Sequence, residues 1–285
     1  MALHPFPRPT QIIAATDGSD LSEVAVFGAR QLADQLGLEL RVIHGISRVE
    51  SPDSAIVTAA RRQASAANAQ LDLIELEEHF LSHASTALAQ HMDAMPGALL
   101  CLGSHGRGGA RAAVLGSVAT EVVHRIEGPL LVFGPNATAP DKYRRVVACT
   151  DGSSFASLAV DIAARFARDL DLPLWVVDAV EPDQGDTPFV VALGHELAAL
   201  GIKANWDTLH SHRPGPAIVD FVDAEPGTIS VLATHGRTGW RELLMGSVAT
   251  NVVRHAKGPV LLARPTAILR VPDASPVARL AAQCT

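Results

Sequence analysis

The chain of 285 residues has few aromatic residues and few cysteines. Phenylalanine, tryptophan and tyrosine make up 4% of it, against a total hydrophobic content of 48%. The core must therefore be built from Ala, Val, Leu and Ile, which fits helices packed on a buried parallel sheet. The three cysteines, Cys101, Cys149 and Cys284, show no metal-ligand spacing. Cys101 and Cys149 lie in apolar runs, where we expect unreactive thiols.

Positive charge is also scarce. The net charge is −7, and lysine occurs only at Lys142, Lys203 and Lys257. General binding to nucleic acid or to anionic membranes needs a positive surface, so both are disfavoured. No apolar run approaches the length of a membrane-spanning helix, and the first residues lack the basic and apolar regions of a signal peptide. We expect a cytoplasmic protein that binds neither nucleic acid nor membranes.

The most informative feature that is present is an internal repeat. Three blocks occur twice: Thr-Asp-Gly-Ser at 16–19 and 150–153, His-Gly-Arg at 105–107 and 235–237, and Gly-Ser-Val-Ala-Thr at 116–120 and 246–250. Two copies of one module follow. We expect one domain at 1–137 and a second at 143–266, joined by a short polar linker, with a tail at 267–285 that has no counterpart.

Within each half, short apolar runs alternate with helical patterns. The expected strands are 11–16, 38–46, 72–80, 98–102 and 130–133 in the first half, and 145–150, 172–180, 202–210, 228–232 and 260–263 in the second. Leu158, Ile162, Phe166 and Leu170 recur every four residues and predict one apolar helix face. This alternation is typical of an open, doubly wound parallel sheet, an α/β fold.

The segment 53–95 is the one place where two lines of evidence disagree. Its composition favours helix almost throughout, but the repeat aligns 72–80 with 202–210, which alternates like a strand. Because helix propensity is a weak prior, we predict a strand at 72–80.

A glycine-bearing block in each half suits an anionic ligand. In the first half it reads Gly103-Ser104-His105-Gly106, then nine residues, then Gly116-Ser117. Glycines allow backbone N–H groups to approach an anion, and the start of the following helix adds free N–H groups and a positive dipole end. We expect Ser117 to cap that helix or to bond a phosphate oxygen. Arg107 adds positive charge nearby.

Two common nucleotide motifs are missing. There is no Gly-x-x-x-x-Gly-Lys-Ser/Thr, and no Gly-x-Gly-x-x-Gly after the first strand, which argues against nicotinamide dinucleotides. His105 and His235 have no Ser–His–Asp or metal arrangement around them, so we predict no catalytic residue and no protein-built metal site. Asp17 and Asp151 end the first strands, where they would accept hydrogen bonds from ribose hydroxyls or, alternatively, cap the next helix.

The pattern Gly-x2-Gly-x9-Gly-Ser, with Thr-Asp-Gly-Ser closing the first strand, resembles the universal stress protein family in its tandem form. The resemblance covers 11–135 and 145–265. It implies two tandem Rossmann-like (adenine nucleotide alpha hydrolase-like) domains, each a five-stranded parallel sheet of order 3-2-1-4-5 flanked by helices. It also implies binding of ATP, ADP or AMP with Mg²⁺ on the phosphates, and a role in stress sensing or signalling.

The resemblance carries a set of nucleotide-binding positions onto this sequence. In the first half they are Thr16, Asp17, Gly45, Gly103, Gly106, Arg107, Gly116, Ser117 and Val118. In the second half they are Thr150, Asp151, Ala179, Ala233, Gly236, Arg237, Gly246, Ser247 and Val248. Gly45, at the end of the second strand, would offer its backbone to the adenine. Ala233 departs from the pattern, which has Gly there.

The family also implies an arrangement of the two halves. Its fifth strands commonly pair across a two-fold axis, so we expect 130–133 and 260–263 to pair and make the chain its own pseudo-dimer. Further self-association stays open. Two alternative functions also stay open: a weak ATP hydrolase or adenylating enzyme, and a nucleotide-free scaffold that acts through protein contacts. The Thr-Asp-Gly-Ser loop differs from the Ser-Gly-Gly-x-Asp-Ser loop of the related pyrophosphatases, which counts against an enzyme.

Overall fold

A computed structural model describes residues 8–47, 50–76, 82–106, 115–126, 130–185, 188–199, 201–234 and 245–263. The strands of the first half are β1 (Gln11–Ala15), β2 (Leu40–Ser47), β3 (Gln70–Leu76), β4 (Ala98–Gly103) and β5 (Leu130–Phe133). Those of the second half are β6 (Arg145–Cys149), β7 (Leu174–Val180), β8 (Ala204–His210), β9 (Thr228–Ala233) and β10 (Val260–Ala263).

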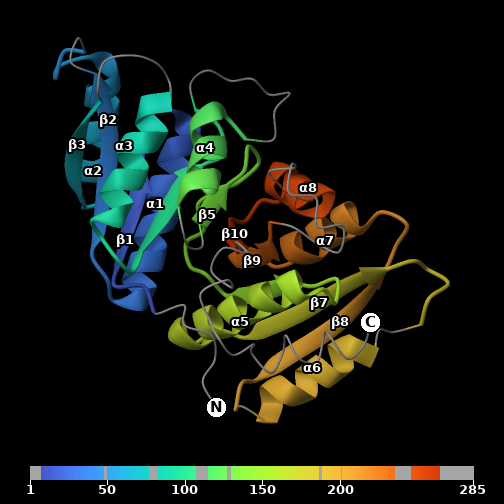
Figure 1. The fold of residues 1–285 in the computed structure, drawn as a ribbon. Helices are drawn as coiled ribbons and strands as arrows, with labels where there is room; N and C mark the ends of the chain where they lie inside the picture. Colours follow the sequence, from blue (N-terminus) through green and yellow to red (C-terminus); the bar gives the residue numbers. More distant parts are fainter. Residues whose placement is uncertain are drawn as a thin grey trace.

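All of these strands belong to a single sheet. Their order is β3-β2-β1-β4-β5-β10-β9-β6-β7-β8, so each half contributes the predicted 3-2-1-4-5 arrangement of parallel strands (Figure 1). The α/β fold class predicted from the sequence is confirmed. The two five-stranded units also form one continuous sheet, because their fifth strands, β5 and β10, lie side by side.

The seam between the halves is the pairing of β5 with β10. The two strands are antiparallel, with Leu131 opposite Leu261 and Val132 opposite Val260. Every residue of both strands is buried. This confirms the predicted pairing of 130–133 with 260–263, and it gives the chain the internal pseudo-symmetry expected from the repeat.

Helices cover both faces of the sheet. The helices are α1 (Asp20–Leu36), α2 (Ala55–Ala66), α3 (Ser82–Asp93), α4 (Ser117–Arg125), α5 (Ser154–Asp169), α6 (Pro188–Ala199), α7 (Pro214–Asp223) and α8 (Ser247–His255). Residues of α1, α2, α5 and α6 share one apolar core, and residues of α3, α4, α7 and α8 share the other. None of these helices is long and apolar enough to cross a membrane.

The helices that follow the first strands form for the predicted reason. The stripe Leu158, Ile162, Phe166 and Leu170 is at most 6% exposed, so it is the face that α5 packs on the sheet. Ser153 begins this helix by accepting a hydrogen bond from the Ala156 backbone N–H at 3.2 Å. In the first half, α1 ends at Gly37, whose φ of 66° is the left-handed conformation that favours glycine.

The disputed segment contains both a helix and a strand. The helix α2 ends at Ala66, and β3 runs beside β2 from Gln70. Sheet pairing therefore overrides local helix propensity. The strand starts two residues before the predicted 72–80, and positions 77–81 lie outside the described residues. In contrast, the second strand of each half starts two residues later than predicted, at Leu40 and at Leu174.

The linker is more than a polar spacer. Thr138 donates its backbone N–H to the Lys257 carbonyl at 2.9 Å, which ties the linker to the chain just after α8. Gly134 packs so closely on α8 that a Cβ there would lie 1.8 Å from the Val253 carbonyl oxygen. At its other end, Tyr143 exchanges two hydrogen bonds with the Gln35 side chain on α1, at 2.7 and 3.1 Å. The linker thus joins both halves.

Candidate functional site

The turn after β1 is organised by Asp17. Its Oδ1 accepts hydrogen bonds from the backbone N–H of Ser19 at 3.0 Å and from the Ser19 hydroxyl at 2.6 Å. Gly18 has a φ of 78°, and its N–H donates to Thr16 Oγ1 at 3.0 Å. Ser19 is the residue that caps α1, by accepting from Ser22 N–H at 3.3 Å. Asp17 therefore orients the cap rather than serving as the cap itself.

The second half builds the same turn. Asp151 Oδ1 accepts from Ser153 N–H at 3.0 Å, and Thr150 Oγ1 accepts from Gly152 N–H at 3.1 Å. Gly152 has a φ of 77°, so both copies need glycine at this position. The repeated Thr-Asp-Gly-Ser sequence is thus explained by one repeated backbone conformation.

Three chain segments meet at the carboxyl edge of the first half. A Cβ on Gly106 would lie 2.5 Å from Asp17 Oδ2, so the loop after β4 contacts the turn after β1. A Cβ on Gly116 would lie 3.7 Å from the Gly106 nitrogen. The Gly116 N–H donates to the Ser104 carbonyl at 2.7 Å, which holds the start of α4 against this loop. Asp17, Gly106 and Gly116 were predicted as site residues, and the fold brings them together.

The start of α4 offers donors to this corner. Its N-cap is Gly116, and no side chain caps it. Among the described residues, the N–H groups of Ser117 and Val118 have no hydrogen-bond partner, as expected of a first helical turn. These donors and the helix dipole favour an anion here. Of the two roles predicted for Ser117, capping is wrong, because the helix already begins at Ser117; bonding a phosphate oxygen stays a prediction. Arg107 lies outside the described residues.

The second half repeats this corner. Gly246 is the N-cap of α8, again without a side-chain cap, and its N–H donates to the Thr234 carbonyl at 2.8 Å. A Cβ on Gly246 would lie 3.8 Å from the Thr234 carbonyl oxygen, an ordinary contact, and no other described residue would come closer. Ser247 and Val248 begin α8 as Ser117 and Val118 begin α4. Gly236 and Arg237 lie outside the described residues.

Gly103 and Ala233 are equivalent positions of the two halves, and Ala233 departs from the glycine pattern. Their surroundings show why one position favours glycine and the other accepts alanine. Gly103 is not among the glycines with positive φ, so its backbone would accept alanine. A Cβ there would lie 3.1 Å from Leu21 Cγ and 3.3 Å from the His105 carbonyl oxygen. Crowding by Leu21 of α1 and by the His105 carbonyl, and not backbone strain, is what favours glycine at 103. Ala233 ends β9 in the second half with ordinary strand pairing to Ala263.

Gly45 and Ala179 lie near the ends of the second strands, as predicted: Gly45 pairs with Ile74, and Ala179 pairs with Leu209. The Thr16 N–H donates to the Ile43 carbonyl at 2.9 Å, so continuing the register places Gly45 level with Asp17. A Cβ on Gly45 would lie 3.0 Å from Leu76 Cδ2.

Sequence reasoning missed the buried polar side chains beneath the first turn. Gln63 on α2 is 0% exposed, His44 on β2 is 2% exposed, and Ser22 on α1 is 4% exposed. All three bond to the 16–19 turn. The available signal was Gln63 itself, a polar residue at helical spacing from the buried Val57 and Ala60.

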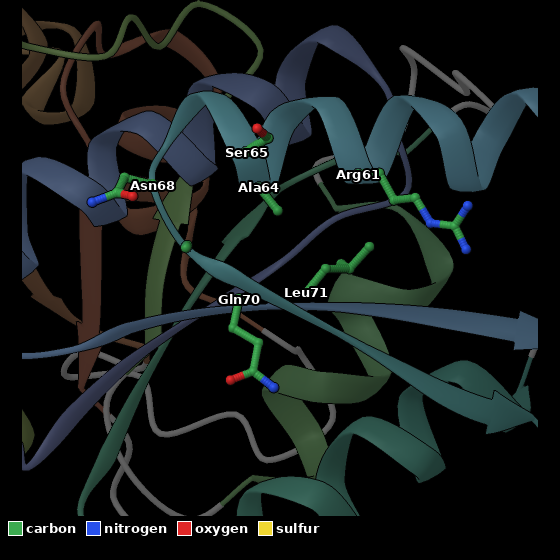
Figure 2. Close-up of a pocket in the computed structure, with 7 residues that line it drawn as sticks. Arg61, Ala64, Ser65, Asn68, Gln70 and Leu71 are labelled. Carbon is green, nitrogen blue, oxygen red and sulfur yellow. The ribbon is translucent and has the colours of Figure 1, made fainter.

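One surface hollow lies away from this site. It has a volume of about 430 Å³ and lies where α2 leads into β3, with Arg61, Ser65, Asn68 and Gln70 among its residues (Figure 2). These four side chains are exposed. The hollow contains none of the predicted site residues, and it lies at the amino ends of the strands.

The fold and the site together define a class: tandem Rossmann-like units joined in one sheet, each with a glycine-lined corner at its carboxyl edge. The chain belongs to the universal stress protein family, whose model matches residues 9–134 and 142–264. A universal stress protein of Mycolicibacterium smegmatis is 29% identical over 187 residues, which cover 59% of this chain and 62% of that protein. The match therefore spans less than two thirds of that relative.

The chain is also similar to other relatives and to solved structures. A universal stress protein of Methanocaldococcus jannaschii is 26% identical over 140 residues, covering 43% of this chain and 82% of that protein. The crystal structure of a universal stress protein from Archaeoglobus fulgidus has a TM-score of 0.62 at 18% identity, covering 92% of this chain and 98% of that one. A universal stress protein solved in complex with cAMP is 27% identical, covers 43% of this chain and 97% of that one, and has a TM-score of 0.36.

Proposed function

We propose that this chain binds an adenine nucleotide, ATP in preference, at the carboxyl edge of each half. Asp17 accepts from the ribose hydroxyls and the Gly45 backbone lies against the adenine. The phosphates lie over Gly106 and Gly116 and take hydrogen bonds from the first turn of α4. The corresponding residues of the second half are Asp151, Ala179, Gly246, Ser247 and Val248. Arg107, Arg237 and Gly236 belong to the same proposal.

The observation that carries the proposal is the contact of Asp17 with Gly106 in front of an uncapped helix. The Cβ position of Gly106 is 2.5 Å from the Asp17 carboxylate, so an acceptor for hydroxyls adjoins a glycine loop. The α4 N-terminus next to it has no side-chain cap. A carboxylate beside free amides suits a ligand with hydroxyls at one end and phosphates at the other.

Mg²⁺ would be held mainly by the ligand. Within the described residues no group of three His, Cys, Asp or Glu side chains could hold a metal ion. Mg²⁺ in nucleotide sites commonly takes phosphate oxygens and water, with few protein ligands. The bound metal would supply charge neutralisation of the phosphates, and the amides of Ser117 and Val118 would orient them.

The biological role that follows is a nucleotide-dependent sensor or signalling protein of the stress response, acting in the cytoplasm. Its structural units would be 1–137 and 143–266, with 267–285 as a tail. Nucleotide binding would change the stability or the partners of the protein. Cys101 and Cys149 are buried free thiols, which agrees with a reducing compartment.

Titration calorimetry with native mass spectrometry tests the proposal. The wild-type chain should bind two ATP molecules, each single variant, Gly116→Val or Gly246→Val, should bind one, and the double variant none. GTP serves as the control for base selectivity. Flat calorimetry for ATP with folded wild-type protein would overturn the proposal and favour a scaffold. Accumulation of ADP or AMP over time would show turnover and favour the hydrolase.

A further inference from the structure

We propose that Gln63 is a positioning residue that holds the Thr16–Asp17 turn of the first site, and that the described residues of the second half supply no side chain that bonds the turn on both sides of Asp151. The first site is therefore preorganised and binds nucleotide more tightly than the second. The affinity difference rests on the proposed function, whereas the hold on the turn can be tested without any ligand.

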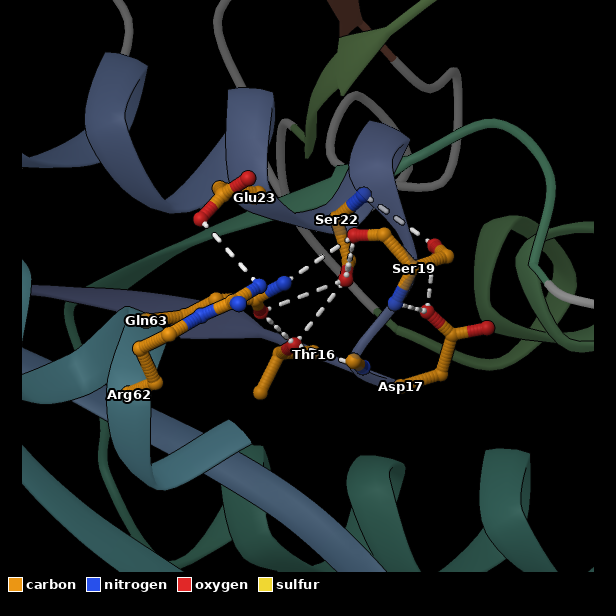
Figure 3. A network of polar contacts seen from close by, with 8 residues as sticks. Thr16, Asp17, Ser19, Ser22, Glu23, Arg62 and Gln63 are labelled. Carbon is orange, nitrogen blue, oxygen red and sulfur yellow. Dashed lines mark hydrogen bonds and ion pairs between the residues drawn. The ribbon is translucent and has the colours of Figure 1, made fainter. Parts of the chain in front are cut away.

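Gln63 reaches the turn from a different helix. From the buried face of α2, its Oε1 accepts the Thr16 hydroxyl at 2.5 Å and its Nε2 donates to the Ser19 carbonyl at 3.1 Å (Figure 3). These two bonds fall on either side of Asp17. A single amide thus fixes the residues before and after the carboxylate that we assign to the ribose.

Ser22 completes the same network. Its hydroxyl lies 2.9 Å from Thr16 Oγ1 and donates to the Ser19 carbonyl at 2.8 Å. Thr16 is 6% exposed, Ser22 4% and Gln63 0%, so water competes little for these groups. Buried hydrogen bonds of this kind are strong when all are made, and losing one partner leaves the others unsatisfied.

The helix also backs the turn by direct packing. Gly18 lies against α2 so closely that a Cβ would come within 3.1 Å of Ala59 Cβ and 3.2 Å of the Ile56 carbonyl oxygen. Gln63 is thus the polar member of an otherwise apolar contact. A displacement of α2 would therefore move the residues on both sides of Asp17.

A further hold comes from β2. His44 Nδ1 lies 2.8 Å from the Thr16 carbonyl oxygen, which can only accept, so the ring proton is on Nδ1. Its Nε2 is buried and has no hydrogen-bond partner among the described residues. This hydrogen bond from His44 fixes the backbone at Thr16 from below.

The second half has different residues at each of these positions. Ala156 follows its cap Ser153 as Ser22 follows Ser19, and it has no hydroxyl to bond to Thr150. The bond to the cap carbonyl comes instead from Ser157, whose hydroxyl donates to the Ser153 carbonyl at 3.2 Å. Asp178 takes the strand position of His44, and a carboxylate has no N–H to donate. The buried residues of α6 are all without a hydrogen-bonding side chain: Phe189, Val190, Leu193, Gly194 and Leu197.

The threonine hydroxyl of the second turn reflects this difference. Within the parts of the chain that are described, the Thr150 side chain has one hydrogen bond, from the Gly152 N–H at 3.1 Å. Thr16 has that bond and also those to Gln63 and Ser22. A turn that is already ordered loses less conformational freedom on binding, so the first site should be tighter by roughly tenfold.

Hydrogen exchange on the ligand-free chain tests the hold itself. Amides of 16–22 should exchange more slowly than those of 150–156, and Gln63→Met, which keeps the volume, should raise exchange at 16–22 only. Leu197→Met on the buried face of α6 is the matched control and should leave 150–156 unchanged. Equal exchange of the two turns in the wild type, or a rise spread over the whole chain in Gln63→Met, would overturn the inference.

Calorimetry then tests the effect on binding. In a Gly246→Val background, which isolates the first site, Gln63→Met should weaken ATP binding by roughly tenfold. Because Gln63 acts through Thr16, the loss should shrink in a Thr16→Val background and persist with Thr16→Ser. A lowered Tm with unchanged ATP affinity would show a merely structural role and refute the claim. If the wild type binds no ATP, the proposed function fails, while the exchange comparison still decides whether Gln63 holds the turn.

Discussion

The hydroxyl of Tyr143 donates a hydrogen bond to the backbone carbonyl of Gly28 at 3.1 Å. Tyr143 is the only tyrosine of the chain, is 0% exposed and stands just before β6, whereas Gly28 lies in the middle of α1. A Cβ on Gly28 would lie 2.4 Å from the Phe133 ring and 3.1 Å from the Tyr143 hydroxyl. The missing side chain at 28 therefore makes room for the two rings that join the halves.

Truncating Tyr143 should destabilise the whole chain. Tyr143→Ala removes a fully buried ring, and such changes cost about 3–5 kcal/mol. Tyr143→Phe removes only the hydroxyl and should cost about 1 kcal/mol. Urea unfolding of the three proteins measures both. Tyr143 bonds to α1 of the first half and leads directly into β6 of the second, so we expect the two halves of the wild type to unfold together. A Tyr143→Ala protein as stable as the wild type would contradict this account of the interface.

Gly106→Ala should disable the first nucleotide site. The added methyl would lie 2.5 Å from Asp17 Oδ2, so the carboxylate must move away from its position. We expect ATP affinity at the first site to fall by roughly tenfold or more, by calorimetry in the Gly246→Val background. Gly185→Ala is the control, because nothing lies within 4 Å of a Cβ there. Equal ATP affinity in Gly106→Ala and Gly185→Ala would refute the role given to Asp17.

The two buried cysteines should be unreactive in the folded chain. Burial raises the pKa of the Cys149 thiol to about 12 and raises that of Cys101 well above its usual range. Since the thiolate is the nucleophile, alkylation at about pH 8 should leave both unmodified in the native protein and modify both in denaturant. Peptide mass spectrometry reads the outcome. Native labelling of either residue would mean that the core opens readily.

The same pKa shift has a consequence for stability. The unfolded thiol loses its proton above about pH 8.5, whereas the folded Cys149 thiol keeps it until about pH 12. Its contribution is therefore fully present below the unfolded pKa and is lost as the pH rises through that window. A Cys149→Ala variant should show a shallower loss of stability with alkaline pH. If the free energy of unfolding, measured in urea, fell equally with pH in both proteins, the raised pKa of Cys149 would be contradicted.

The order of strands within each half followed from the family resemblance, and the repeat supplied a second copy of every element. The pairing of β5 with β10 followed from the family resemblance, and the strand at β3 followed from aligning 72–80 with 202–210 against its local helix propensity. Asp17, Gly106 and Gly116 were found because short motifs mark the ends of strands and the starts of helices. Local sequence pattern was enough to place these three residues.

Other features depend on contacts that no local pattern encodes. Gln63 meets Thr16 from 47 residues away, and Tyr143 meets Gly28 from 115 residues away. A lone buried glutamine or tyrosine carries no periodicity, so its partner is known only once the helices are packed. The end of β2 is another example: the strand runs to Ser47, one residue past the predicted end at 46, where Ser47 pairs with Leu76 of β3. Strand ends are set by neighbours and not by composition.

Two substitutions of increasing size at Gly116 should show whether glycine is needed there for space or for its backbone conformation. The φ of Gly116 is −66°, so any residue fits its backbone, and the nearest atom to a Cβ is His105 Cα at 3.4 Å, an ordinary contact. Gly116→Ala should therefore fold normally and weaken ATP binding only in part. Gly116→Val adds branches that project into the space over the α4 amides and should abolish binding at the first site. Both variants should keep the Tm within a few degrees of wild type. If Gly116→Val retains a stoichiometry of two ATP molecules, the phosphates do not lie at this helix start; if both variants unfold, the glycine serves packing and the assignment of the corner must be withdrawn.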